Sequence, residues 1–150
     1  MKTAKGAVRP AKPGDAPRLA LLLGQLGNPC GVGEARGRLE RAAAADSRAV
    51  FVAADASGKA VAFAELRQIP SLMLGEAEAE LLALVVDEKA RRTGIGRALM
   101  EKAEAWTRGR GCRLLRLRTQ VKRLDAHAFY ERLGYKRIKT QHIYRKDLNG

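Results

Sequence analysis

The chain has 150 residues, of which 46% are hydrophobic, and its formal net charge is +13. This length suits one domain with a single core, and no apolar run approaches the ~18 residues that a membrane span needs. No apolar stretch follows the first lysines, so no secretory signal is predicted, and the two cysteines lack the spacing of metal ligands. We therefore expect a single-domain cytoplasmic protein, residues 1–150, without a metal.

The first half of the chain is predicted to contain a short strand, two helices and two further strands. The predicted elements are a strand at residues 8–10, helices at 15–26 and 34–45, and strands at 50–53 and 60–66. Asp15 can cap the first helix, whose apolar stripe stops at Gly27. The second helix has a weaker pattern that is rich in Ala and Arg.

In the second half, predicted strands and helices alternate, which favours a mixed α/β sheet. Strands are expected at residues 76–86 and 114–119, helices at 95–110 and 125–133, and the last stretch, residues 135–148, alternates apolar and polar side chains. Residues 81–86 are apolar on both faces, which is typical of a central strand that is covered on both sides.

A short basic turn follows this strand and leads into the helix at residue 95. Several backbone N–H groups then lie at a helix N-terminus, where the partial positive charge favours an anion. Gly94 and Gly96 let the backbone approach a bulky ligand closely. Fixed positive charge is added by Arg91, Arg92 and Arg97. The segment predicts a cradle for a diphosphate.

Two familiar phosphate-binding loops do not fit this segment. A P-loop ends in Gly-Lys-Ser/Thr, which is absent, and a dinucleotide fingerprint needs a third glycine where this chain has Leu99. The pattern that remains is an apolar strand, then Arg-x-x-Gly-x-Gly, then a helix. It resembles the acetyl-CoA signature of the GNAT N-acetyltransferase superfamily.

A second stretch carries the same resemblance. Many GNAT proteins have an Asn, an Ala three residues later, a Phe-Tyr or Leu-Tyr pair, and then Gly-Phe or Gly-Tyr. The matching residues here are Ala126, Phe129, Tyr130, Gly134 and Tyr135. The chain departs from the pattern at Arg123, which stands where the Asn usually contacts CoA.

The resemblance implies a mixed α/β fold whose central sheet is mostly antiparallel, has about six to seven strands, is flanked by about four helices and is splayed at the central strand. It also implies acetyl-CoA as co-substrate. The pyrophosphate would be held by backbone N–H groups of residues 92–97, and the pantetheine arm would pair with the central strand. The residues implied to bind the co-substrate are Leu84, Val86, Arg91, Arg92, Thr93, Gly94, Ile95, Gly96 and Arg97.

Acyl transfer from a thioester to an amine needs a neutral amine, donors for the oxyanion and a proton for the leaving thiolate. By resemblance Tyr130 lies near the CoA sulfur, and a phenol is protonated at neutral pH, so Tyr130 is the candidate general acid; the alternative is a packing role. The family often takes its base from a Glu of the central strand, which makes Glu78 and Glu80 candidates acting through water. With Glu76 they alternate, so in an extended strand they share one face and would attract a cationic acceptor.

The predicted function is transfer of an acetyl group from acetyl-CoA to a primary amine of a small-molecule acceptor, by direct attack in a ternary complex. The high charge also motivates a protein or aminoacyl-tRNA N-acetyltransferase, and a non-catalytic acyl-CoA-binding sensor is a third reading. Nucleic-acid contact is open but not favoured, because only 5% of residues are aromatic and no binding motif is present. A homodimer stays open, and no membrane partner is expected.

Overall fold

The computed structural model describes residues 7–150, and its backbone falls into two units, Met1–Arg118 and Thr119–Gly150. The first unit contains the sheet and most of the helices, and the second contains α4 (Leu124–Arg132). The prediction of one domain over residues 1–150 stays a prediction. No helix among the described residues is long and apolar enough to cross a membrane.

The described residues form one five-stranded sheet in which neighbours in space are also neighbours in sequence. Its strands are β1 (Val8–Pro10), β2 (Arg48–Ala54), β3 (Ala60–Gln68), β4 (Glu78–Val86) and β5 (Leu114–Leu117). All pairs are antiparallel except β4 and β5, which are parallel because α3 connects them across one face. The mixed, mostly antiparallel architecture is confirmed.

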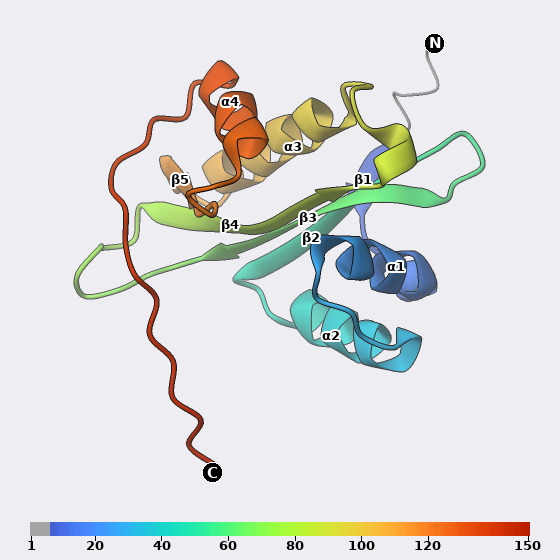
Figure 1. Cartoon of the computed structure of the whole chain (residues 1–150), viewed down its shortest axis with the longest axis horizontal. Helices are drawn as coiled ribbons and strands as arrows, with labels where there is room; N and C mark the ends of the chain where they lie inside the picture. The colour runs from blue at the N-terminus through green and yellow to red at the C-terminus, as the bar shows by residue number, and fades with distance from the viewer. Residues whose placement is uncertain (1–6) are drawn as a thin grey trace. The chain divides into compact units, whose positions relative to one another are not determined.

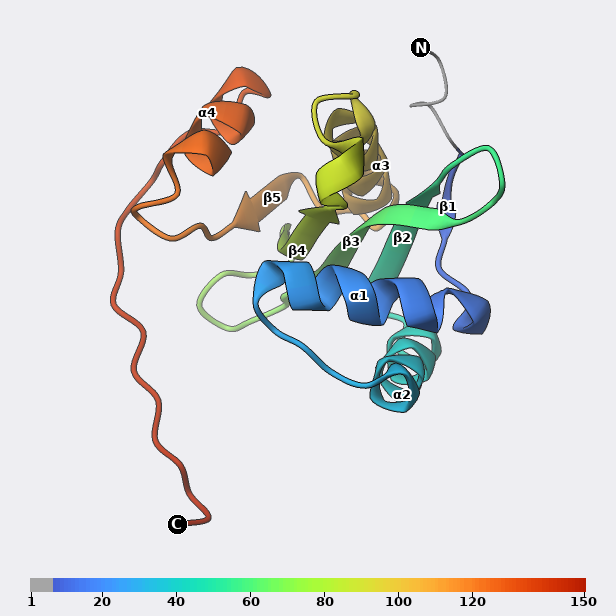
Figure 2. The same ribbon diagram turned by 45° about the vertical axis from the view of Figure 1, so that its right-hand side comes forward.

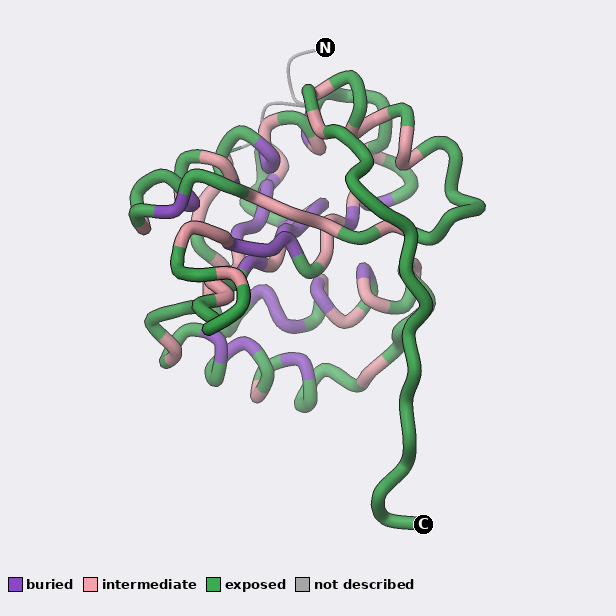
Figure 3. The backbone as a smooth tube through the Cα atoms, turned by 90° about the vertical axis from the view of Figure 1, so that its left-hand side faces the viewer, coloured by how far each residue is buried: buried purple, intermediate pink, exposed green. Residues whose placement is uncertain are grey.

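The expected number of six to seven strands is wrong for residues 7–150, which contain five. The difference lies in the second unit, where residues 135–148 form no strand and every residue from 136 onward is exposed (Figure 3). Ile143 and Tyr144, which carry the apolar alternation, are 82% and 92% exposed. Alternation favours an extended backbone, but a strand also needs a hydrogen-bonding neighbour.

Helices cover both faces of the sheet in the first unit (Figure 1). One face carries α1 (Ala16–Leu26) and α2 (Val32–Ala44), and the other carries α3 (Ile95–Gly109), as the turned view in Figure 2 also shows. Leu22 of α1, Leu66 of β3 and Leu99 of α3 are almost fully buried. Each contributes roughly 1.5–3 kcal/mol by leaving water. The short 3-10 turns η2 (Pro13–Asp15) and η3 (Glu88–Ala90) precede α1 and α3.

Asp15 stands at the start of α1 as predicted, but its side chain does not cap that helix. The carboxylate instead accepts hydrogen bonds from the backbone N–H of Lys12 and from Arg9, both at 2.8 Å. Burial alone would raise the pKa of Asp15, yet these hydrogen bonds outweigh it and hold the pKa below its ordinary value. The other end follows the prediction, since Gly27 ends α1 with φ 96°.

Strand β4 is irregular on both of its edges. On the β3 side, Glu65 pairs with Ala83 but Leu66 pairs with Leu81, so Leu82 is an extra residue in a β-bulge. On the other side, β5 pairs only with residues 78–81. Residues 82–86 therefore have no strand beside them on that edge within the described sheet.

Candidate active site

Asp87 fixes the point where β4 gives way to the turn before α3. Its backbone N–H donates to the carbonyl of Val61 at 2.8 Å, and its buried carboxylate accepts from Lys89 N–H at 3.1 Å and from Arg18 of α1 at 2.6 Å. Burial would raise the pKa of Asp87, but the hydrogen bonds from Lys89, Arg18 and Gln25 outweigh it and lower the pKa. Sequence reasoning missed this residue, although an Asp directly after an apolar strand is a usable signal.

The segment of residues 91–97, here called the cradle, presents a run of backbone donors. Ala90 and Ala98 on either side donate their N–H groups to the carbonyls of Asp87 and Gly94 at 2.8 and 3.0 Å. Within the described chain, the N–H groups of residues 91–97 have no acceptor. The last three of these open α3, so the positive end of the helix dipole adds to them. The predicted cradle residues are thus brought together.

Two residues of the cradle adopt left-handed backbone conformations. Gly94 has φ 85°, and Arg92 has φ 64°, which costs a non-glycine residue about 1 kcal/mol. The turn is tied down by two side chains: the Thr93 hydroxyl donates to the carbonyl of Ala90, and Arg91 Nε donates to the carbonyl of Val86 at 3.2 Å. A Cβ at position 94 would stand in open space, so crowding does not require a glycine there. The positive φ of the backbone does.

Charge and burial divide the cradle residues into two kinds. Arg91, Arg92 and Arg97 are exposed, and Arg97 makes only a loose ion pair with Glu101 at 3.9 Å. Ile95 is 5% exposed, so it can offer a ligand its backbone N–H but not its side chain. A phosphate group would meet N–H donors from the backbone and exposed guanidinium groups from the side chains.

Leu84 and Val86 lie in the part of β4 that extends beyond β5. Both side chains are half-buried, and the β5-side edge of this stretch has no strand partner among residues 7–150. An unpaired strand edge can hydrogen-bond an extended ligand in the way that it would pair with another strand. The structure places both predicted residues at the end of β4, four or more residues before the cradle.

The two candidate bases lie at the other end of β4, on the same face as α1 and α2. The sheet register aligns Arg48, Arg67, Glu80 and Arg116 across four strands. Glu80 is 3% exposed and has an arginine at each oxygen: Arg67 is 3.1 Å from Oε1 and Arg118 is 3.5 Å from Oε2. A buried carboxylate needs such partners.

Glu78 is less enclosed, because only its Oε2 is paired, with Arg116 at 3.7 Å. Glu76 precedes the strand and is exposed, so the expected row of three carboxylates reduces to two. Together with Glu65, which pairs with Arg48 at 3.2 Å, the face carries four arginines and three glutamates in mutual ion pairs. We call this set the charged row. Sequence reasoning missed its arginines; the alternation of Arg116 and Arg118 was the available signal.

Tyr130 belongs to the second unit, on α4, and is half-buried among aromatic neighbours. Its ring meets Phe129 and Tyr135 edge to face, with centroids 5.0 and 6.0 Å away, and its carbonyl accepts from Tyr135 N–H at 3.0 Å. Burial raises the pKa of Tyr130 to about 12, against a smaller opposing effect of Arg123. The phenol therefore keeps its proton at any physiological pH.

Comparison with known proteins identifies the family. The sequence model of the Acetyltransferase (GNAT) family matches residues 25–135, which is most of the chain and includes both motifs. The chain belongs to the GNAT acetyltransferase family. The aminoglycoside N(6')-acetyltransferase type 1 of Stenotrophomonas maltophilia is 31% identical over 144 residues, covering 94% of this acetyltransferase and 93% of the relative.

Two further relatives differ in what they share with this GNAT acetyltransferase. The aminoalkylphosphonate N-acetyltransferase of Salmonella typhimurium is 46% identical over 57 residues, which are 38% of this chain and 37% of that protein. The structure of aminoglycoside N-acetyltransferase AAC(6')-Iy, solved in complex with CoA, has a TM-score of 0.81 at 21% identity, with 93% of each chain covered. That likeness shows a common fold.

This GNAT protein is an acetyl-CoA-dependent N-acetyltransferase. The chemistry of the cradle fits the co-substrate, because N–H groups without an acceptor among the described residues and three arginines suit a diphosphate. The residues predicted from the sequence at both ends of β4 lie in the first unit, and Tyr130 lies in the second.

Proposed function

We propose that this acetyltransferase moves the acetyl group of acetyl-CoA to a primary amine of a small-molecule acceptor, by direct attack in a ternary complex. The observation that carries the proposal is the cradle, whose unpaired N–H groups stand beside an unpaired length of β4. The N–H groups of residues 92–97 would hold the pyrophosphate. The pantetheine arm would pair with the backbone of Leu84 and Val86 as an additional strand does.

The proposed chemistry is one addition and one elimination. The neutral amine nitrogen attacks the thioester carbon, a C–N bond forms, the C–S bond breaks, and the CoA thiolate takes a proton from the Tyr130 hydroxyl. The proton lost by the amine passes through water to a carboxylate of β4. Glu78 and Glu80 are both candidates, and Glu78 is favoured because only one of its oxygens is in an ion pair.

The names of the relatives support an amine acceptor without fixing its charge. One relative is named for aminoglycosides, which carry several ammonium groups, and another for aminoalkylphosphonates, which carry an acid group. A protein or aminoacyl-tRNA acceptor is the second candidate, motivated by the net charge of +13. Salt separates the two, because nucleic-acid binding weakens steeply with added salt whereas the KM of a small amine does not.

Calorimetric titration with acetyl-CoA, and separately with CoA, is the first test. We expect micromolar binding that is lost in the double variant Arg91→Ala, Gly94→Asp. Gly27→Asp is the matched control, since Gly27 also has a left-handed φ in open space but ends α1. Absence of binding to the unaltered protein at low salt would contradict the proposal and the sensor alternative together.

The role of Tyr130 is tested by Tyr130→Phe and by a pH profile. The variant should bind CoA normally but lose about 10²- to 10⁴-fold in kcat, the usual contribution of a general acid. Because the pKa of Tyr130 in the free enzyme is about 12, kcat/KM of the unaltered enzyme should not fall as the pH rises from 8 to roughly 10.5. In a non-catalytic sensor, the substitution would change nothing. A fall of kcat/KM centred near pH 9 would assign the proton donated to the thiolate to another group.

A further inference from the structure

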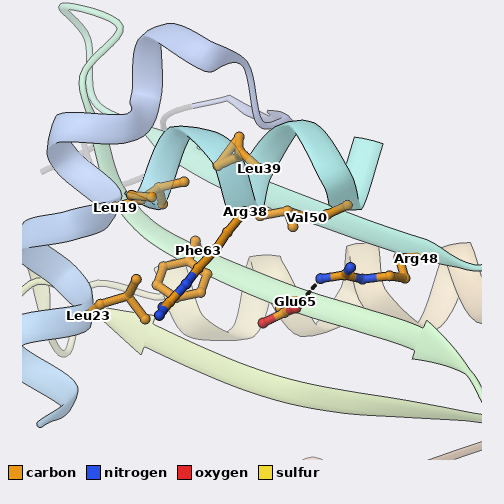
Figure 4. Close-up of a pocket in the computed structure, with 10 residues that line it drawn as sticks. Leu19, Leu23, Arg38, Leu39, Arg48, Val50, Phe63 and Glu65 are labelled. Carbon is orange, nitrogen blue, oxygen red and sulfur yellow. Dashed lines mark hydrogen bonds and ion pairs between the residues drawn. The ribbon is translucent and has the colours of Figure 1, made fainter. Parts of the chain in front are cut away.

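A pocket lies between the α1–α2 helix pair and the sheet, on the face that carries the charged row. Figure 4 shows it, with side chains from α1 and α2 above the strands β2 and β3. The lining residues are Leu19, Leu23, Ala35, Arg38, Leu39, Ala42, Arg48, Val50, Phe63 and Glu65. We call this the α1–α2 pocket. All of its residues belong to the first unit.

The inner lining of the pocket is apolar. Phe63 of the sheet and Leu39 and Leu19 of the helices are each buried and belong to the core cluster between the helices and the sheet. A hydrocarbon or aromatic group placed there would exchange water for this surface, at roughly 25 cal/mol for each Å² of apolar area. A sugar ring, whose hydroxyl groups need hydrogen-bond partners, would find few on this apolar lining.

The charges of the pocket do not suit a polycation. Its one carboxylate, Glu65, is already paired with Arg48 at 3.2 Å, and its remaining charged residue is Arg38. The charged row that continues from Glu65 toward β5 has more arginines than glutamates. An ammonium group placed on this face would meet carboxylates that arginines already occupy.

Arg38 is placed to receive an anion. Its side chain extends from α2 across the front of Phe63 toward Leu23 (Figure 4). Its partner in the structure is Glu34, one helical turn earlier at 2.6 Å, and the two side chains are 48% and 55% exposed. Exposed pairs of this spacing are worth only about 0.3–0.5 kcal/mol, so a ligand carboxylate or phosphonate can share or replace Glu34 at small cost.

The strand at which transfer is proposed to take place, β4, pairs with β3, which lines the pocket. Glu65 pairs with Ala83 of β4 in the sheet register, directly beside the bulge at Leu82. Ala83 packs against the same core cluster as Leu23 and Val50, which line the pocket. A molecule seated in the pocket therefore lies one strand away from β4, on the face of the sheet that carries the candidate bases.

We propose that the acceptor is an amine that also carries an apolar side group and an acid group, as an apolar α-amino acid does. The apolar group occupies the α1–α2 pocket, the acid group binds Arg38, and the amine is turned toward β4. This inference rests on the proposed acetyl transfer and narrows its substrate class. It separates this chain from relatives named for polycationic acceptors.

A panel of four amines tests each part of the inference by measuring CoA release from acetyl-CoA. Phenylalanine has both groups, phenethylamine lacks the acid, glycine lacks the side group, and kanamycin is a polycation. We expect kcat/KM for phenylalanine to exceed each of the others by roughly tenfold to a hundredfold, the effect of one charge-assisted hydrogen bond or one buried apolar group.

A pair of variants on α2 locates the acid group. Arg38→Gln should reduce kcat/KM for phenylalanine to the value for phenethylamine and leave phenethylamine unchanged. Arg36→Gln is the matched control, because Arg36 lies on the same helix and is exposed but does not line the pocket. Both substitutions remove one positive charge, so an effect of net charge alone would appear in both.

The outcomes distinguish this inference from the proposed function. Preference for kanamycin, or equal use of phenylalanine and phenethylamine, would overturn the inference while confirming acetyl transfer. If no amine is acetylated, calorimetric titration of phenylalanine into the CoA-saturated protein decides: binding that Arg38→Gln abolishes supports the pocket while turnover fails, and no binding overturns it.

Discussion

The two ends of β4 illustrate two ways of building a binding site. After its C-terminal end, the cradle offers backbone N–H groups from one continuous segment, residues 91–97. Along the face at its N-terminal end, the charged row and the α1–α2 pocket are assembled from side chains of two helices and four strands. A site made of backbone depends on φ angles and tolerates changes of side chain. A site made of side chains depends on which residues are present and is less affected by the φ angles of any one segment.

The largest effect expected at either end of β4 comes from breaking the backbone of the cradle. Gly94→Asp forces a residue with a Cβ into φ 85° and places a negative charge where the diphosphate is proposed to bind. Backbone strain of about 1–3 kcal/mol together with charge repulsion predicts a loss of acetyl-CoA affinity of at least about 100-fold. Calorimetry against Gly27→Asp measures it. Unchanged affinity would show that the cradle does not bind the co-substrate.

Asp87→Asn tests the anchor between the turn and α1. Loss of the charge-assisted hydrogen bond from Arg18 should cost about 1.5–3 kcal/mol of unfolding free energy at pH 7. The folded-state pKa of Asp87 is lowered, so its contribution is fully present above its unfolded pKa of about 4 and is lost as the pH falls through the lower folded value. Urea unfolding at pH 7 and pH 3 should therefore show the difference between the two proteins shrinking in acid. A constant difference would assign the cost to packing.

Substitutions of Glu80 and Glu78 are a matched pair of tests of the charged row. Glu80→Gln leaves two arginines beside a buried neutral group and should cost about 1–2 kcal/mol of stability, discounted because both arginines are about half exposed. Glu78→Gln should cost less stability but more kcat, since Glu78 is the favoured base. Thermal unfolding and single-turnover rates separate the two effects. The reverse ranking in kcat would make Glu80 the base.

The smallest effect is expected where the cradle loses a side chain but keeps its backbone. Arg92→Gly removes one charge and relieves φ 64°, while glycine adds about 0.5–1 kcal/mol of chain entropy to the unfolded state. These terms nearly cancel, so stability should change by less than about 0.5 kcal/mol and acetyl-CoA affinity by only a few-fold. A hundredfold loss of affinity would make the Arg92 side chain, rather than the backbone, the main phosphate contact.

The same division explains what the sequence could predict. The cradle and α1 are visible locally, because Gly94 and Gly27 mark positive φ values where a helix begins or ends. The arginines around Glu80 come from β3 and from the residue after β5, so only the strand register brings them together. Residues 135–148 show the converse: their alternation of apolar and polar side chains is local, but the described sheet places no strand beside them.

The stretch of β4 beyond β5 has a further consequence for the protein between catalytic cycles. A strand of a second polypeptide can pair with an unpaired strand edge. The exposed Leu82 in this stretch makes such pairing more favourable. In the proposed complex the pantetheine arm occupies those same backbone groups. Acetyl-CoA would then protect its own enzyme from aggregation, and the lifetime of the protein in storage would depend on how well it is supplied with co-substrate.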